Sequence, residues 1–200
     1  MATINYKLIK NFISSEELKV YQKYCYNKLD VNKDYVMDDT HSFSPSWHDD
    51  PLMNVILDTK LPLVEKESNL ELFPTYAYWR YYIFGGTLKQ HRDRPACEVS
   101  ITTCIKKHDN WPLIIEKESF ELEEGDALLY AGCVQKHGRP GVYKGEGMAQ
   151  IFMHYVNKKG PFTHHAYDKY NKSRRVKYSE EDLKIINEEI NNYRNNNKKS

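Results

Sequence analysis

The sequence has almost no net charge. Its 200 residues contain 29 lysines and arginines against 28 aspartates and glutamates, which leaves a formal net charge of +1. Such a balance provides no overall electrostatic attraction to nucleic acid or to an anionic membrane, so neither is expected as a partner. Long apolar runs are lacking too, because none approaches the ~18 residues that a membrane-spanning helix needs.

Cysteines are few and scattered. The four of them form no C-x-x-C pair and no dense framework, which favours reduced thiols over a disulfide scaffold. The N-terminus lacks the apolar core and the small-residue cleavage site of a secretion signal. We therefore expect a cytoplasmic protein with reduced thiols at Cys25, Cys97, Cys104 and Cys133.

Internal repeats are absent, and no clear second domain is visible. A chain of this length is large enough to bury a proper core on its own. We expect one domain over 1–200, with an N-terminal helical part at 1–70, a core at 71–160 and a C-terminal extension at 161–200.

The pattern of apolar residues changes near residue 75, from a helical period to an alternation of two. Before this point, Ser14 or Ser15 caps a helix, and a second helix is expected at about 52–60. The polar stretch from Asp30 to Asp50 lies between them and is expected to be an irregular loop. After residue 75, apolar residues alternate with polar ones, which predicts strands at about 75–84, 97–105, 112–116, 119–122, 126–131 and 148–156.

The two ends of the chain add one element each. Tyr6 to Phe12 is expected to form a short edge strand, and a last helix follows Ser179. Many short strands with frequent turns favour a β-sandwich or a jelly-roll barrel. The predicted fold class is therefore α+β and mainly β, with the N-terminal helices packed on one face and a C-terminal helix.

The stretch from Thr75 to Asp93, TYAYWRYYIFGGTLKQHRD, carries the first chemical signal. Because residues i and i+2 of an extended segment point to the same face, His91 and Asp93 converge while Arg92 points away. They are two thirds of the set of two histidines and one carboxylate that holds Fe(II) in non-heme oxygenases. The alternative is an exposed turn that contains a His and an Asp by chance.

A third ligand is available further along the chain. The run GDALLYAG, which starts at Gly125, predicts a tight turn into a buried strand, and His137 follows it. A barrel brings distant strands side by side, so His137 can lie opposite His91 and Asp93. Otherwise, His137 is a surface histidine beside Lys136.

Taken together, these runs resemble the Fe(II)- and 2-oxoglutarate-dependent dioxygenases, in the branch similar to prolyl 4-hydroxylases. The resemblance covers the region from about Leu70 to Pro161. It rests on YWRYYIFGG, on HRDRPACEVSIT, on GDALLYAG with His137, and on MAQIFMHYV. It implies a double-stranded β-helix, a jelly-roll or cupin-like core.

The resemblance also implies a site and a reaction. His91, Asp93 and His137 would be the iron ligands, and no other protein group would be needed for catalysis. The cofactors would be Fe(II), 2-oxoglutarate and O2, with ascorbate as an optional addition. The enzyme would hydroxylate an unactivated C–H and release succinate and CO2. The expected substrate is a peptidyl or free amino acid, prolyl by analogy.

One part of the family pattern is missing. Such enzymes commonly hold the distal carboxylate of 2-oxoglutarate with an Arg or Lys at the start of the strand after the distal histidine, but Glu146 to Gln150 contains neither. The nearest candidates are Arg139 and Lys144, and the alternative for both is plain loop solvation. Arg80 is a further candidate. Tyr82, which shares its strand parity, occupies the place of a tyrosine that hydrogen-bonds 2-oxoglutarate.

The substrate side is less defined. We expect Arg94 to contact the substrate and Trp47, in the 30–50 stretch, to form part of the mouth. On the last strand, one of Gln150 and His154 is expected to reach the cavity, or else to be a satisfied polar group of the core.

Two other functions compete with the hydroxylase. The missing basic residue favours a non-catalytic sensor that binds a metal or a keto acid on the same fold. A nucleic-acid demethylase would need a basic channel, which the charge balance argues against.

Overall fold

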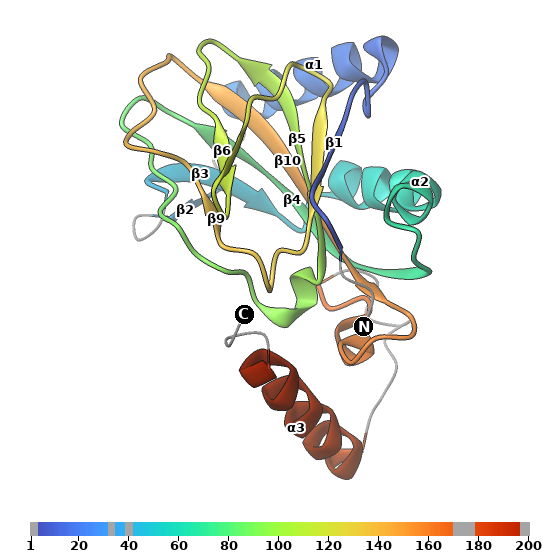
Figure 1. Ribbon diagram of the computed structural model, residues 1–200. Coiled ribbons are helices and arrows are strands. Elements are labelled where there is room, and N and C mark those ends of the chain that lie inside the picture. Colours follow the sequence, from blue (N-terminus) through green and yellow to red (C-terminus); the bar gives the residue numbers. More distant parts are fainter. Residues whose placement is uncertain (1–3, 32–34, 39–41, 170–178, 197–200) are drawn as a thin grey trace.

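A computed structural model describes residues 4–31, 35–38, 42–169 and 179–196 (Figure 1). The helices are α1 (Ser15–Val31), α2 (Pro51–Ser68) and α3 (Glu180–Asn196), with short 3-10 turns η1 (Pro95–Cys97) and η2 (Thr163–His165). The strands are β1 (Lys7–Ile9), β2 (Val36–Asp38), β3 (Ser44–His48), β4 (Leu72–Tyr82), β5 (Val99–Lys107), β6 (Leu113–Ile115), β7 (Glu118–Phe120), β8 (Ala127–Tyr130), β9 (His137–Gly138) and β10 (Met148–Asn157).

The strands form two antiparallel sheets. The larger has seven strands in the order β1-β8-β5-β10-β4-β3-β2, and the smaller has three in the order β7-β6-β9. Sequence neighbours are often not sheet neighbours, as in a jelly roll: β10 lies between β4 and β5. A cluster of buried side chains from β5, β6 and β8, among them Cys104, Leu113 and Leu128, joins the two sheets. The expected α+β class is confirmed.

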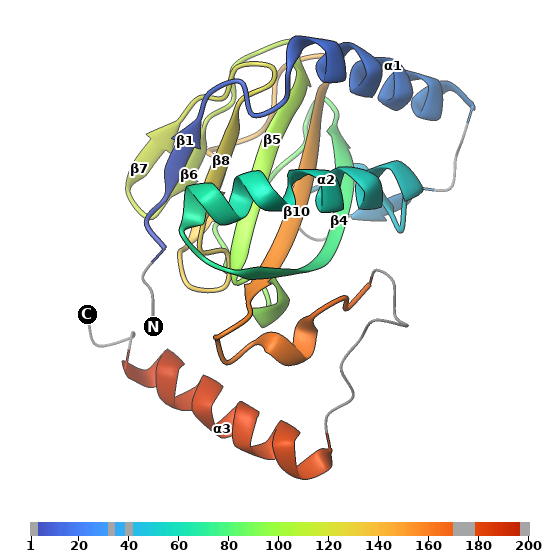
Figure 2. The same cartoon turned by 90° about the vertical axis from the view of Figure 1, so that its right-hand side faces the viewer.

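Helices α1 and α2 cover one face of the larger sheet, and Figure 2 shows α2 lying across β5, β10 and β4. Asp50 caps α2 by accepting a hydrogen bond from the Leu52 amide at 2.9 Å, and Pro51 occupies the first turn, where its missing N–H costs nothing. The buried Tyr155 hydroxyl donates to the carbonyl of Leu57 at 3.0 Å and so ties β10 to α2. The helix cover predicted for this face is present.

The stretch from Asp30 to Asp50 differs from the expected loop. It contains β2 and β3, and β3 extends the larger sheet by pairing Trp47 with Trp79 of β4. The first four residues of β3 are all buried, so the alternation that marks a half-exposed strand is absent. The Trp47 ring stacks on Trp79 at 4.0 Å within the apolar core, with 2% of its surface exposed.

The chain after β10 turns back along the start of β4. The Tyr167 amide donates to the carbonyl of Pro74 at 2.8 Å and that of Lys169 to Thr75 at 3.3 Å. Beyond this segment, α3 buries Ile190 against Phe162. None of the described helices is long and apolar enough to cross a membrane.

Candidate active site

His91 and His137 are held by one short piece of main-chain pairing. After β4, the segment from Thr87 to Arg94 runs beside β9. There the amide of each histidine donates to the carbonyl of the other at 2.9 Å. The next strand-like bond joins the Arg139 amide to the carbonyl of Leu88 at 2.8 Å. A two-residue strand such as β9 is too short to show a period in the sequence, but it sets the distance between the two imidazoles.

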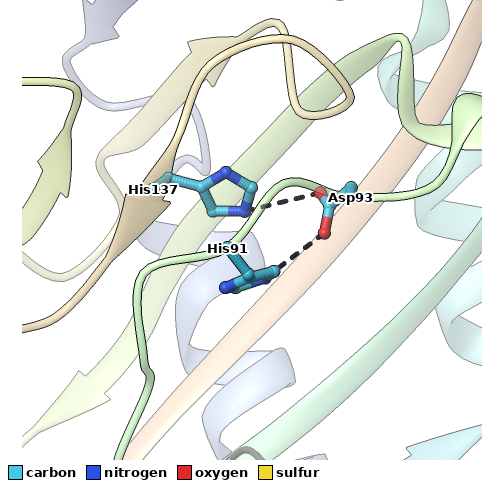
Figure 3. Close-up of side chains that lie close together, drawn as sticks. All are labelled: His91, Asp93 and His137. Atoms are coloured by element: carbon cyan, nitrogen blue, oxygen red, sulfur yellow. Dashed lines mark ion pairs between the residues drawn. The ribbon is translucent and has the colours of Figure 1, made fainter.

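The carboxylate of Asp93 lies beside the two rings and directs one oxygen to each (Figure 3). His91 Nε2 is 3.4 Å from Asp93 Oδ1, and His137 Nε2 is 3.5 Å from Asp93 Oδ2. One donor atom from each residue lies within 4.8 Å of the other two. Donor atoms bonded at ~2 Å to a shared ion lie at most ~4 Å apart, so the two Nε2–Oδ separations suit a single metal ion. Two imidazoles and a carboxylate are also the donor set that Fe(II) prefers.

The ring orientations of both histidines are fixed by the backbone. His91 Nδ1 lies 2.8 Å from the carbonyl of Lys89, and His137 Nδ1 lies 3.0 Å from that of Gln135. A carbonyl can only accept, so each Nδ1 carries a proton, and Nε2 is the ring nitrogen that faces Asp93. This arrangement prepares both Nε2 atoms to bind a metal without rotation of the rings.

Asp93 is ionised and tightly placed. Its burial alone would raise the pKa of the carboxyl, but hydrogen bonds from His137 and His91 outweigh burial and hold the pKa far below its usual range. Its main-chain amide donates to the carbonyl of Gly132 at 2.9 Å. A Cβ at Gly132 would lie 2.6 Å from Asp93 Oδ2 and 2.4 Å from the Ser100 hydroxyl. Only glycine at position 132 leaves enough space for the Asp93 carboxylate.

Asp93 also belongs to a second group, because it, Cys97 and His154 each bring a donor atom within 4.8 Å of the others. Burial raises the pKa of the Cys97 thiol well above its ordinary value, and the charge of Asp93 raises it further. Burial lowers the pKa of His154 to about 4, and its Nδ1 is 3.0 Å from the Ser100 hydroxyl. A cysteine binds a metal as its thiolate, so the protonated Cys97 does not favour a second metal site, and Cys97 and His154 line the cavity.

The three donor residues open onto a cavity of about 320 Å³. Among the described residues that line it are four arginines, Arg80, Arg92, Arg94 and Arg139, against a single carboxylate, Asp93. The cavity is therefore strongly cationic although the chain as a whole is nearly neutral. A site of this kind favours anionic ligands.

Aromatic rings from the larger sheet make much of the remaining wall. Tyr78 stacks on Phe152 at 4.8 Å on one side and on His48 at 4.7 Å on the other. Tyr76 and Tyr82 belong to the same face of β4 and line the same cavity. Their alternation with the core residues Ala77 and Trp79 could have been read from the sequence, but of this row only Arg80 and Tyr82 were predicted to face inward.

Arg139 brings its guanidinium to the start of β10, where the sequence itself has no Arg or Lys. Its Nη2 donates to Gln150 Oε1 at 3.0 Å and its Nη1 donates to the carbonyl of Trp111, while its guanidinium lies 5.9 Å from the centre of the Tyr82 ring. Only 6% of Arg139 is exposed, which is not compatible with loop solvation. Arg80 faces Gln150 across the β4–β10 pairing and places its guanidinium 5.8 Å from the same ring.

Most of the site residues predicted from the sequence lie around this cavity: His91, Asp93 and His137, with Arg80, Tyr82, Arg94 and Arg139. Two do not. Lys144 is exposed in the loop before β10, as its alternative interpretation stated, and Trp47 packs in the core on the other face of the sheet. His154 lines the cavity, and Gln150 is bonded by Arg139 at its edge.

No family model matches the sequence, and no curated protein is similar enough to match it. Solved structures do match. A prolyl-4-hydroxylase from Pseudomonas putida superposes with a TM-score of 0.63 at 14% identity, over 80% of this chain and 95% of that one. The non-heme, α-ketoglutarate-dependent epimerase SnoN from nogalamycin biosynthesis superposes with a TM-score of 0.65 at 10% identity, over 76% of each chain.

The chain has the fold of the Fe(II)- and 2-oxoglutarate-dependent oxygenases. The double-stranded β-helix expected from the sequence is thereby confirmed. HygX from Streptomyces hygroscopicus, solved with nickel, 2-oxoglutarate and hygromycin B, adds a third match with a TM-score of 0.62 at 12% identity, over 78% of this chain and 84% of that one. Chains with this oxygenase fold thus include a prolyl hydroxylase and an epimerase, so the fold alone does not name a substrate.

Proposed function

We propose that this protein is an Fe(II)- and 2-oxoglutarate-dependent oxygenase that hydroxylates an unactivated C–H of a peptidyl or free amino acid. The observation that carries the proposal is the meeting of His91, Asp93 and His137 at the wall of a cavity rich in arginine. When bound, Fe(II) with 2-oxoglutarate and O2 supplies the oxidation of C–H to C–OH, with succinate and CO2 as the other products.

The residues of this chain hold and orient the reactants. The two Nε2 atoms of His91 and His137 and the carboxylate of Asp93 would hold the ion at the wall of the cavity. At the Gln150 end, the buried guanidinium of Arg139 is suited to the distal carboxylate of 2-oxoglutarate, because it offers a planar fork of donors. Arg80 and Tyr82 add a second cation and a hydroxyl beside it. The carboxylate of Asp93 is ionised throughout, so it needs no deprotonation before it binds the ion.

Tyr76, Tyr78 and Phe152 form an aromatic wall of the cavity, against which the apolar part of a substrate would pack. The sensor alternative rested on the lack of a basic residue at the start of β10. Arg139 brings a guanidinium to that strand from the loop after His137, so this ground for preferring a sensor no longer applies.

The first test is anaerobic addition of Fe(II) and 2-oxoglutarate to the purified chain. We expect a weak visible charge-transfer band and, after O2 is admitted, succinate. His137→Ala should lower iron affinity by more than ~100-fold, because changes to groups that only support a ligand already cost 10–100-fold. His108→Ala, which removes an exposed histidine paired at 3.7 Å with Glu146, is the matched control. Equal iron affinity in His137→Ala and the parent would refute the proposal.

A further inference from the structure

The rim of the cavity carries an arginine that already holds a carboxylate. Arg94 follows Asp93 directly, and 40% of its side chain is exposed. Its guanidinium lies 4.7 Å from the centre of the Tyr76 ring, which lines the cavity, and its Nη1 is 2.5 Å from Asp168 Oδ2. One end of this ion pair therefore belongs to the cavity, and the other belongs to the segment that returns after β10.

A defined turn delivers Asp168 to this place. Tyr167 adopts a positive φ of 56°, a conformation that costs energy for a bulky side chain and persists where neighbouring contacts impose it. Those contacts are the bond from its amide to the carbonyl of Pro74 and the packing of its ring 6.0 Å from that of Phe73. The Asp168 amide donates to the carbonyl of His165 at 3.1 Å. These backbone hydrogen bonds and the ring packing hold Asp168 against Arg94.

The charges around this pair do not cancel. Lys169 places its Nζ 5.5 Å from the centre of the same Tyr76 ring, so two cations and one carboxylate surround it. The cavity behind the ring adds Arg80, with Asp93 as the only carboxylate among its described lining residues. The mouth consequently retains a positive charge that attracts an anion even while Asp168 is in place.

We propose that the organic substrate presents a carboxylate to Arg94 and displaces Asp168 from it. The proposal rests on the proposed oxygenase function and specifies its substrate class. In the free protein, the Asp168 carboxylate stands in for that of the substrate. The stacked rings of Tyr78 and Phe152, deeper in the cavity, are placed to pack against the apolar part of the same molecule.

Only the arginine end of the pair is open to solvent, because 40% of the Arg94 side chain is exposed against 14% of the Asp168 side chain. A second carboxylate can therefore approach the guanidinium from solvent, and Asp168 leaves a largely buried position when it is displaced. A substrate carboxylate regains the same charge-assisted hydrogen bonds from Arg94 and adds burial of its apolar atoms. The α-carboxylate of a free amino acid and an acidic side chain of a peptide would both meet these requirements.

The test is an anaerobic titration of the protein loaded with Fe(II) and 2-oxoglutarate, followed through the visible band. The probes are the N-acetyl L-amino acids, their amides, and blocked dipeptide amides that contain Glu or, as the uncharged match, Gln. The wild type should prefer acids over amides at least about tenfold, as expected for loss of one charge-assisted bond. A preference within the N-acetyl series identifies an α-carboxylate, and a preference for Glu over Gln identifies an acidic side chain.

Variants separate binding from structural support. Arg94→Gln should weaken binding of the acids at least about tenfold and abolish the preference over amides, and Arg94→Lys should restore part of it. Asp168→Asn should act in the opposite direction and tighten binding of the acids, by up to about fivefold, because the competing carboxylate is gone. Lys159→Gln, which breaks a remote surface pair with Glu71, is the control for loss of one positive charge.

The proposal requires the two variants to change the affinity for acids in opposite directions. If Arg94→Gln and Asp168→Asn change acid binding in the same direction, the pair is only a clamp for the returning segment and the proposal is overturned. It is equally overturned if the band forms but no acid is preferred over its amide. Absence of the band in the wild type would instead remove the oxygenase function itself, and the substrate assignment with it.

Discussion

The two faces of the larger sheet are built from the same strands but from different chemistry. Along β10, Ile151, Met153 and Tyr155 point to the helices and belong to the main apolar core. On the other face, Phe152 and His154 line the cavity. Strand β4 repeats the pattern, since Ala77 and Trp79 face the helices while its even-numbered residues from Tyr76 to Tyr82 face the cavity.

The difference shows how the molecule separates stability from chemistry. The helix-facing side buries apolar surface, the main favourable term in folding. The cavity side buries polar groups that need partners, such as His154 with the Ser100 hydroxyl and the guanidinium of Arg139 with Gln150. Neighbouring residues on one strand should therefore respond very differently to substitution.

The largest effect should follow a change on the helix-facing side. Trp79→Ala removes a fully buried ring stacked on Trp47, which should lower the free energy of unfolding by about 3–5 kcal/mol. Denaturant titration of the metal-free protein measures this loss. Tyr78→Leu, one residue away on the cavity side, is the matched variant and should cost clearly less. Equal losses would break the comparison between the two faces.

A second effect should appear where β5 and β10 meet at the end of the sheet. Burial raises the pKa of Glu98 to about 7, although its carboxylate accepts a bond from the Asn157 amide at 2.8 Å. The unfolded chain ionises this group near 4.5, so the folded state alone keeps the proton between these values. The contribution of Glu98 to stability should be fully present below pH 4.5 and be lost, by up to about 3 kcal/mol, as pH rises through 7.

Glu98→Gln keeps an acceptor for Asn157 without a charge, so it should flatten this part of the pH profile. Denaturant titrations at intervals from pH 4.5 to 8 give the measurement. Glu71→Gln, at an exposed carboxylate 2.6 Å from Lys159, serves as the comparison and should keep the slope of the wild type. An unchanged slope in Glu98→Gln would show that this carboxyl does not titrate as inferred.

The smallest of the three effects concerns the cavity side. Arg139→Gln should weaken 2-oxoglutarate binding about 10–100-fold, the loss of a charge-assisted hydrogen bond of about 1.5–3 kcal/mol. The apparent KM for 2-oxoglutarate measures it, with iron affinity as the readout that should not change. Arg80→Gln should have a smaller effect, because Arg139 is the residue bonded to Gln150. The reverse order would reassign the carboxylate anchor to Arg80.

Much of this arrangement was predictable from local patterns. The two-residue spacing of His91 and Asp93 and the shared parity of Arg80 and Tyr82 are properties of an extended chain, and the structure keeps both. The strands from residue 72 onward, apart from β9, lie close to their predicted ranges because turn residues bound them.

The failures have physical causes too. Trp47 was assigned to a mouth because its surroundings are polar in sequence, but Ser44 and Ser46 beside it are buried in β3 and carry no alternation. The reach of Arg139 to Gln150 depends on a long side chain crossing between two elements. No spacing rule encodes that reach, so the sequence could offer Arg139 only as one candidate beside Lys144 and Arg80.

The reciprocal main-chain pairing of His91 and His137 has a dynamic consequence. Two amides that protect each other exchange with solvent only when the same local opening frees both, so the two imidazoles lose their alignment together or not at all. An ion gripped by both rings adds its affinity to the cost of that opening. Binding of a metal ion should therefore slow amide hydrogen exchange at His91 and His137 and leave exchange in the rest of the sheet unchanged.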